Sequence, residues 1–217
     1  CYYLFSKIQN LESYDWLIAS ACLADYCYRK NQPWMSKIYD KYDDKFEFSG
    51  FFIRKNGKMW DLQYKITLFI TYLDKKLNKV YESIGEGFGE IKNLDKYSSK
   101  VIEEVDEFIK KFEKEKIEIK DGYFWECKSK FDIKSIIVND ISSRYFDKTI
   151  IIGKPASEFY TFSARRQDKK EDMNALMKKL TSGFNNASAG GHIAAAGGHV
   201  LFKDRERFIE KTMNRKI

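Results

Sequence analysis

Residues 187–199 read ASAGGHIAAAGGH, and this stretch holds both histidines of the chain and four of its 12 glycines. Adjacent glycines let the backbone adopt positive φ and approach a ligand closely, with N–H groups turned toward an anion. Because the run Ala194, Ala195, Ala196 favours a helix, the stretch predicts a glycine turn leading into a helix N-terminus, with His192 donating to a phosphate oxygen. The alternative is a close-packed crossing that needs small residues, with His192 as a hydrogen-bonded core imidazole.

Two arginines upstream strengthen the interpretation as an anion site. Arg165 and Arg166 end the aromatic run EFYTFSARR at 158–166. A guanidinium at the end of an apolar strand is costly to hold without an anion beside it. We therefore expect an anionic ligand near this strand end.

The bulk composition restricts the class of protein. The chain has 217 residues, of which 43% are hydrophobic and 16% aromatic, which excludes a disordered chain. No apolar run approaches the roughly 20 residues of a membrane-spanning helix, and the start CYYLFSKIQN lacks a secretory pattern. The net charge of +7 favours an anionic partner, although thermophily or codon usage also produces lysine-rich chains.

The cysteines indicate the redox compartment of the protein, and the first residue indicates whether the chain is part of a longer polypeptide. The four cysteines form no CxxC pair and are expected to be ordinary thiols in a reducing cytoplasm, with a Cys22 to Cys27 redox pair as the alternative. The chain begins at Cys1 instead of methionine, so we expect it to be a piece of a longer polypeptide.

Residues 1–30 are typical of the tail of an α/β unit. The run at 16–24 is apolar or small on every face, which predicts a buried strand and the turn after it. Asp25 follows at what would be the carboxyl edge of a sheet, where open α/β folds bind ligands. The alternative is a helix-cap or loop aspartate.

Residues 31–115 have a helical pattern. One apolar stripe at helical spacing covers six turns, and its members are Leu62, Ile66, Phe69, Ile70, Leu73, Leu77, Val80, Tyr81 and Ile84. A second stripe consists of Val101, Val105, Phe108, Ile109 and Phe112. Between them, IGEGFGEIKNL at 84–94 resembles a phosphate loop only loosely, and a connection between helices is favoured.

Residues 116–217 predict a small α+β or α/β domain. Short aromatic and β-branched runs that suggest strands are GYFWECKS at 122–129, SIIVND at 135–140, KTIIIGKP at 148–155, EFYTFSARR at 158–166 and HVLFK at 199–203. A helix is expected around Met173, Leu176, Met177 and Leu180, and a terminal helix after Asp204.

The order FYTFSARR, DMNALMKKL, AGGHIAAAGG resembles the C-terminal substrate-binding domain of the DHH phosphoesterase superfamily, which includes RecJ-like exonucleases, nanoRNases and cyclic-dinucleotide phosphodiesterases. In that family a strand ending in Ser-x-Arg precedes a helix with an Asn and a GGHxxAAG loop that grips phosphate. The matching positions are Ser163, Arg165, Asn174, Gly190, Gly191, His192, Ala195, Ala196 and Gly197.

The resemblance implies an α/β chain in three parts: the end of a DHH-type catalytic domain at 1–30, a helical insert and connecting helix at 31–115, and a mixed-sheet DHH-associated domain at 116–217. LIASACLADY at 17–26 is more faintly similar to the catalytic segment whose aspartate is the last metal ligand, which makes Asp25 the matching ligand. The family's Asp-x-Asp and Asp-His-His ligands are absent and are expected upstream of Cys1. One carboxylate cannot hold two ions, so Mn²⁺ or Mg²⁺ is implied only for the complete protein.

The resemblance implies a function for this chain as the substrate-binding portion of a phosphodiesterase or exonuclease. Its expected partners are single-stranded or short nucleic acid or a nucleotide, and the missing N-terminal segment, with no membrane. A non-catalytic RecJ-like scaffold in a DNA replication or repair assembly is the alternative. The related domain of alanyl-tRNA synthetases is a third hypothesis, although its glycine-rich loop lacks the form centred on histidine.

Overall fold

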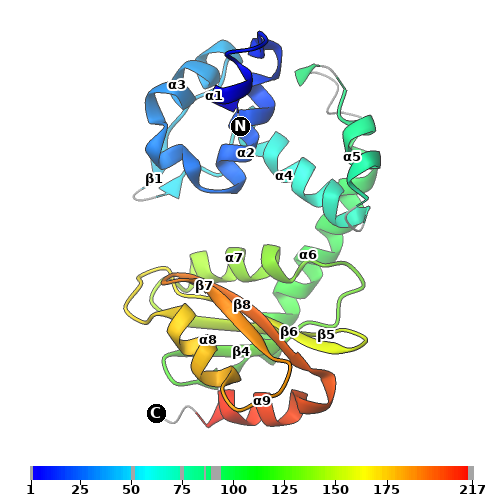
Figure 1. Cartoon of the computed structure of the whole chain (residues 1–217), viewed down its shortest axis with the longest axis vertical. Coiled ribbons are helices and arrows are strands. Elements are labelled where there is room, and N and C mark those ends of the chain that lie inside the picture. The colour runs from blue at the N-terminus through cyan, green and yellow to red at the C-terminus, as the bar shows by residue number, and fades with distance from the viewer. Residues whose placement is uncertain (1, 50–51, 74–75, 86, 89–93, 215–217) are drawn as a thin grey trace. The chain divides into compact units, whose positions relative to one another are not determined.

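The chain folds as two compact units, Cys1–Ile102 and Glu103–Ile217 (Figure 1). The computed structural model describes residues 2–49, 52–73, 76–85, 87–88 and 94–214. Helix α6 (Asp95–Glu115) begins in the first unit and ends in the second. Each unit is described by itself.

The first unit is built mainly from helices. Its elements are α1 (Tyr2–Phe5), the short 3-10 helices η1 (Glu12–Tyr14) and η2 (Cys27–Lys30), α2 (Asp15–Ala24), α3 (Gln32–Lys41), the ribbon β1 (Phe48–Ser49) and β2 (Phe52–Ile53), α4 (Lys58–Tyr72), α5 (Leu77–Ser83) and the start of α6. Residues before and after position 30 share one core, in which Trp16 and Leu23 are buried together with Tyr39, Met59 and Leu62. Residues 2–30 therefore pack with the helices that follow them.

The strand expected at 16–24 is wrong, because this segment forms helix α2. Its buried residues Trp16, Ala19, Ser20 and Leu23 follow the i, i+3, i+4, i+7 spacing of one helical face. Alanine-rich sequence has a high helix propensity, and an apolar run alone does not separate a buried strand from a buried helix. The argument that placed Asp25 at the edge of a sheet does not apply.

The stripe at 62–84 belongs to two helices. Helix α4 ends at Tyr72 and α5 begins at Leu77, while residues 74 and 75 lie outside the described residues. Val80 is buried, but Tyr81 is 81% exposed. The glycine-rich run at 84–94 lies between α5 and α6, as a helix connection would, although residues 86 and 89–93 lie outside the described residues.

The second unit contains a six-stranded mixed sheet, as expected for the C-terminal region. Its strands are β3 (Ile117–Ile119), β4 (Gly122–Glu126), β5 (Thr149–Pro155), β6 (Phe159–Arg165), β7 (Ser188–His192) and β8 (Ala195–Leu201), in the order β3-β4-β5-β6-β8-β7. Strands β4 and β5 are parallel, and the other neighbours are antiparallel. Its helices are α7 (Lys134–Arg144), α8 (Met173–Thr181), the short η4 (Phe202–Asp204) and α9 (Arg205–Met213).

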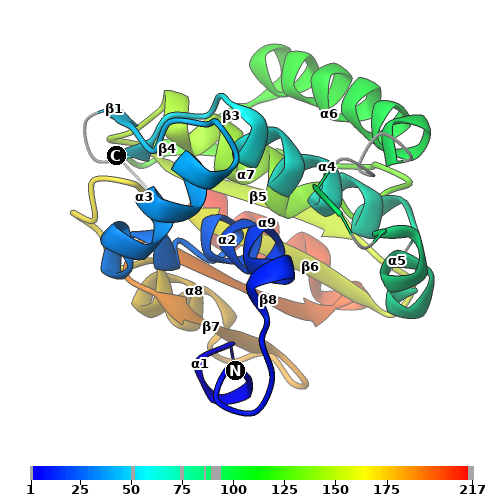
Figure 2. The same ribbon diagram turned by 90° about the horizontal axis from the view of Figure 1, so that it is seen from above.

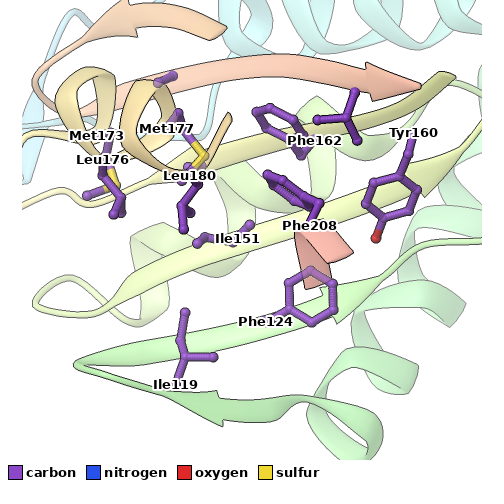
Figure 3. Packing of buried hydrophobic residues seen from close by; sticks show 13 residues of the cluster. Ile119, Phe124, Ile151, Tyr160, Phe162, Met173, Leu176, Met177, Leu180 and Phe208 are labelled. Atoms are coloured by element: carbon purple, nitrogen blue, oxygen red, sulfur yellow. The ribbon is translucent and has the colours of Figure 1, made fainter. Parts of the chain in front are cut away.

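Helices cover the two faces of this sheet unequally. On one face, α8 and α9 enclose a core in which the rings of Phe162 and Phe208 stack with centroids 4.5 Å apart (Figures 1 and 3). On the other face, α7 packs against β5 and β6, and Phe112 of α6 contacts Tyr123 and Trp125 of β4. In Figure 2, β7 and β8 lie on the margin of the sheet away from α6. Their surface on the α7 side is consequently open within this unit.

Residues 135–140 form part of helix α7, so the strand expected there is wrong. Ile137, Val138 and Ile141 are fully buried at positions that share one side of a helix. The β-branched side chains favour a strand locally, but burial against the sheet determines the outcome because helix propensities differ by only about 0.7 kcal/mol per residue.

The helix N-terminus expected at 190–196 is also wrong, because the glycine and histidine stretch is the hairpin β7–β8 with a turn at 193–194. The carbonyl of Ile193 accepts a hydrogen bond from the N–H of Met173, and that of Ala194 accepts one from Arg166. Ala196, which favours a helix by its propensity, is instead buried in the core that the sheet shares with α8. Gly191 has φ +152, and a Cβ atom there would overlap the backbone of Ala195.

Among the described helices, none is long and apolar enough to cross a membrane. Three cysteines, Cys22, Cys27 and Cys127, are free thiols, while Cys1 lies outside the described residues.

Gly198 should tolerate no larger residue in the hairpin. A Cβ atom at Gly198 would overlap the carbonyl oxygen of Ser188 and crowd Phe162, so Gly198→Ala should lower the free energy of unfolding by about 1–3 kcal/mol. Gly190→Ala is the matched control, because an added Cβ there meets nothing within 4 Å, and its effect should stay below about 1 kcal/mol. Urea denaturation measures both, and equal losses would contradict the packing described here.

Candidate phosphate-binding face

Alternation along β6 assigns its side chains to two faces. Tyr160, Phe162 and Ala164 belong to the core under α8 and α9. Since successive side chains of a strand point to opposite faces, Thr161, Ser163 and Arg165 lie on the face of α7.

Arg165 lies in one row with His192. Arg165 of β6 pairs with Ala195 of β8, and Ala195 pairs with His192 of β7. Paired residues of adjacent strands share a face, and two strand spacings amount to about 10 Å. A methyl group is the only side chain between the guanidinium position and the imidazole position in this row.

The next row holds Ser163 and two glycines. Ser163 pairs with Gly197, and Gly197 pairs with Gly190. The two glycines leave the floor of the face without side chains, so a ligand can approach the backbone closely. Two adjacent rows therefore unite the predicted binding residues Ser163, Arg165, Gly190, His192 and Gly197.

Gly191 and Asn174 lie elsewhere. Gly191 pairs with Ala196, which belongs to the core on the opposite face. Asn174 is in the first turn of α8, whose cap Asp172 accepts hydrogen bonds from the N–H groups of Asn174 and Ala175. The Asn174 Oδ1 atom is buried and has no hydrogen-bond partner among the described residues. The structure does not bring these two residues onto the open face.

Arg165 is positioned by an asparagine that the sequence did not reveal. Its Nε atom donates to Asn139 Oδ1 of α7 at 2.8 Å, and its Nη1 atom donates to the carbonyl of Ala164 at 2.9 Å. The sequence gave no signal for Asn139, because its segment has the composition of a strand and was not expected to form a helix. Knowledge that the segment is a helix facing β6 would have been needed to find it.

Arg166 forms ion pairs with carboxylates of the chain itself. Its Nε atom lies 2.8 Å from Asp168 Oδ1, and its Nη1 atom lies 3.9 Å from Glu171 Oε2. The hydrogen bond from Arg166 holds the pKa of the Asp168 carboxyl below its usual range. The expectation that a strand-end arginine requires an external anion is therefore wrong for Arg166.

Lys134 is a further cation on this side of the sheet that the sequence did not reveal. Its Nζ atom donates to Thr161 Oγ1 at 2.8 Å, and the residue is only 8% exposed. Burial lowers the pKa of this amine to about 8, and the positive charges of Lys154 and Arg165 act in the same direction, partly opposed by Asp132. Lys134 directly precedes the strand-like run at 135–140, and lysine is a common residue type, so the sequence gave no signal for it.

The two histidines occupy different environments on the same face. His192 is exposed, which excludes the interpretation as a core imidazole. His199 is half-buried two rows away, and its ring centroid lies 4.6 Å from that of Phe159.

Asp25 is the exposed C-cap residue of α2. Within the part of the chain that the structure describes, no group of three or more His, Cys, Asp or Glu side chains could hold a metal ion. These residues do not fit the divalent site that the sequence resemblance implies. The role of Asp25 as a ligand stays a prediction for a longer chain.

No family model and no curated protein matches the chain. Solved structures do resemble it. One is a DHH-domain protein described as a member of a family of ribosomal proteins, with 16% identity and a TM-score of 0.49; the match covers 72% of this chain and 41% of that one. A second is CDC45 from Entamoeba histolytica, with 12% identity, a TM-score of 0.47 and coverage of 72% and 37%.

A third is the pGpG-specific phosphodiesterase PggH from Vibrio cholerae, with 12% identity, a TM-score of 0.43 and coverage of 72% and 58%. The chain thus matches between 37% and 58% of the length of these three structures. All three matches have TM-scores below 0.5 and identities of 16% or less.

Proposed function

We propose that the second unit binds phosphate groups of a nucleotide or a short single-stranded nucleic acid on the α7 side of β8 and β7 and the adjoining part of β6. The observation that carries the proposal is the register, which puts Arg165 and His192 in one row beside the glycine floor of the next. The net charge of +7 also suits an anionic ligand.

Each residue can supply a distinct part of such a site. The guanidinium of Arg165 is held by Asn139, so its planar donor fork is oriented before a ligand arrives. The exposed His192 can donate a hydrogen bond from the opposite end of the row. Gly190 leaves space for phosphate oxygens, and its row continues through Gly197 to the buried Ser163.

In a longer chain, this face would serve as the substrate-binding portion of a phosphodiesterase or exonuclease that uses Mn²⁺ or Mg²⁺. The metal ligands, other than Asp25, would come from outside the described residues, and the residues described here would bind and orient the phosphate. A non-catalytic scaffold in a replication or repair assembly is the alternative.

Both proposed functions can be tested by incubating the 217-residue chain with Mn²⁺ and a labelled dinucleotide and measuring binding and hydrolysis. We expect binding without hydrolysis, because a lone carboxylate does not hold two metal ions. Robust hydrolysis that persists in Asp25→Ala would show that the assignment of the metal site is wrong.

His192→Ala should weaken binding of a short oligonucleotide by about 1.5–3 kcal/mol, the range for a hydrogen bond to a charged group. Titrations at one fixed salt concentration measure the effect, since affinity for phosphates depends strongly on salt. Lys178→Ala is the control, because Lys178 is an exposed residue of α8 on the opposite face of the sheet. This variant should bind the oligonucleotide with nearly the wild-type affinity. Unchanged affinity in His192→Ala would mean that the hairpin serves packing only.

Asn139→Ala should weaken binding through Arg165, by about threefold to tenfold, because the guanidinium loses the acceptor that holds its Nε atom. A double-mutant cycle with Arg165→Ala distinguishes this positioning role from a general effect on the fold. Once Arg165 is alanine, removing Asn139 should cost little further affinity. Losses that simply add would contradict the coupling.

A further inference from the structure

A groove runs along the end of β4, at the opposite margin of the sheet from the hairpin β7–β8. Its volume is about 460 Å³, and all of its lining residues belong to the second unit. Clefts of this size are typical of binding pockets. The strand order β3-β4-β5-β6-β8-β7 places β4 two strands away from β6. The groove is therefore separate from the candidate phosphate-binding face.

Two helices flank the groove, and each contributes one stripe of side chains. The stripes consist of Phe108, Lys111 and Glu115 on α6 and of Arg205, Ile209 and Met213 on α9. Spacings of three and four positions place residues on one side of a helix. Each helix thus faces the groove along two turns, or about 10–12 Å at 1.5 Å per residue.

The free edge of a strand lies between these two helices. Strand β3 pairs with β4 only as far as Ile117 opposite Phe124, and no strand of the described residues continues beside Glu126 on that side. On the other side, the N–H of Cys127 donates to the carbonyl of Gly153 on β5 at 2.7 Å. Since backbone groups of successive strand residues point to opposite edges, the N–H and C=O of Glu126 point away from β5. An edge of this kind is a template for a further strand.

Apolar side chains line the groove on both faces of the sheet. Phe124 is buried in the core that includes α9. Trp125 is buried on the other face, where its ring meets that of Phe108 edge-on with centroids 5.9 Å apart. Ile117 is exposed at the end of the groove. The side chains of an added strand would alternate between the two faces and would meet apolar surface on each.

The charges of the groove favour an acidic ligand. Its carboxylates Glu115 and Glu126 each accept a hydrogen bond from another side chain of the groove. Its lysines Lys111 and Lys128 reach the solvent, with side chains 44% and 76% exposed. Their ion pairs with Glu107 and Glu126 lie at the surface, where such pairs are weak and exchange readily. Carboxylates of a ligand can therefore approach both lysines.

The space beside the free edge suits a single strand and excludes the same edge of a second copy. Helix α6 packs on Trp125 of β4, while α9 contacts β3 and holds Glu126 through Arg205. Both helices therefore lie over the strands at this margin. Neighbouring strands are about 4.8 Å apart, whereas packed helices need about 8–10 Å between their axes. Helices of a second copy paired along this edge would overlap with those of the first.

We propose that the groove binds an extended segment of a partner protein, which adds a strand to β4 at Glu126 between α6 and α9. About three residues of the segment lie in the groove and are apolar, because an extended chain rises about 3.3 Å per residue. Acidic residues flank them and approach Lys111 and Lys128. Main-chain hydrogen bonds provide affinity in this mode of recognition, and the side chains provide specificity.

The probe is the fluorescently labelled peptide Glu-Glu-Val-Phe-Val-Glu-Glu, titrated with the 217-residue chain. It should bind saturably and about tenfold or more tightly than Lys-Lys-Val-Phe-Val-Lys-Lys, in which attraction to the two lysines becomes repulsion. Methylation of alternate backbone nitrogens tests the added strand. One alternating set should weaken binding by about tenfold or more and the other set much less, because only one set faces β4.

Two further measurements place the peptide in the groove. Lys128→Glu should weaken the acidic peptide by about threefold to tenfold and strengthen the basic one. Lys178→Glu is the matched control, because it makes the same change of charge at an exposed position of α8 outside the groove. Hydrogen exchange at the N–H of Glu126, measured by NMR, should become slower when the acidic peptide binds.

Several outcomes would overturn the peptide site. They are a lack of saturable binding, equal affinity for the acidic and basic peptides, equal losses for the two methylated sets, equal effects of Lys128→Glu and Lys178→Glu, and unchanged exchange at Glu126. Sedimentation of the chain alone tests the other occupant. A dimer that Ile117→Glu dissociates would assign the groove to a second copy and not to a partner peptide.

Discussion

The antiparallel register of β6, β8 and β7 is the constraint on which the candidate site depends. Because side chains alternate along a strand, a shift of one residue would move Arg165 and His192 into the core and bring Phe162 to the surface. The core under α8 and α9 prevents this shift, since Phe162 and Ala164 are buried there together with Val200. The packing of one face thus determines which polar residues appear on the other.

The small residues of the hairpin serve both faces at once. Gly198 allows close contact between β7 and β8, while Gly190 has open space above it. Gly198 and Gly190 look alike in the sequence, but each position requires or permits glycine for a different physical reason. One relieves crowding in the backbone pairing, and the other keeps the exposed face free of side chains.

Cations of the second unit are held in two contrasting ways. Arg166 is neutralised by Asp168 and Glu171, which makes it part of the scaffold at the end of β6. Lys134 is buried beside a hydroxyl group and is repelled by other cations. The first arrangement stabilises the folded chain, whereas burial in the second lowers the pKa of the Lys134 amine to about 8.

The sequence by itself determined the composition of the site and much of the second unit. The stripe from Val101 to Phe112 predicted α6, the apolar positions from Met173 onward predicted α8, and the aromatic and β-branched runs predicted β4, β5 and β6. These signals are local, because periodicity and propensity act within one element. The family motifs also singled out Ser163, Arg165 and His192, although a motif carries no information on the distances between its residues.

Only the tertiary structure decided which apolar runs are helices and which residues meet. The run before Asp25 and the run around Val138 bury helical faces, and short apolar runs of either kind look alike in sequence. The glycine and histidine stretch became a hairpin because β6 offered a partner edge. Lys134 and Asn139 joined the site through the docking of α7, since contacts between residues more than twenty positions apart depend on how whole elements pack.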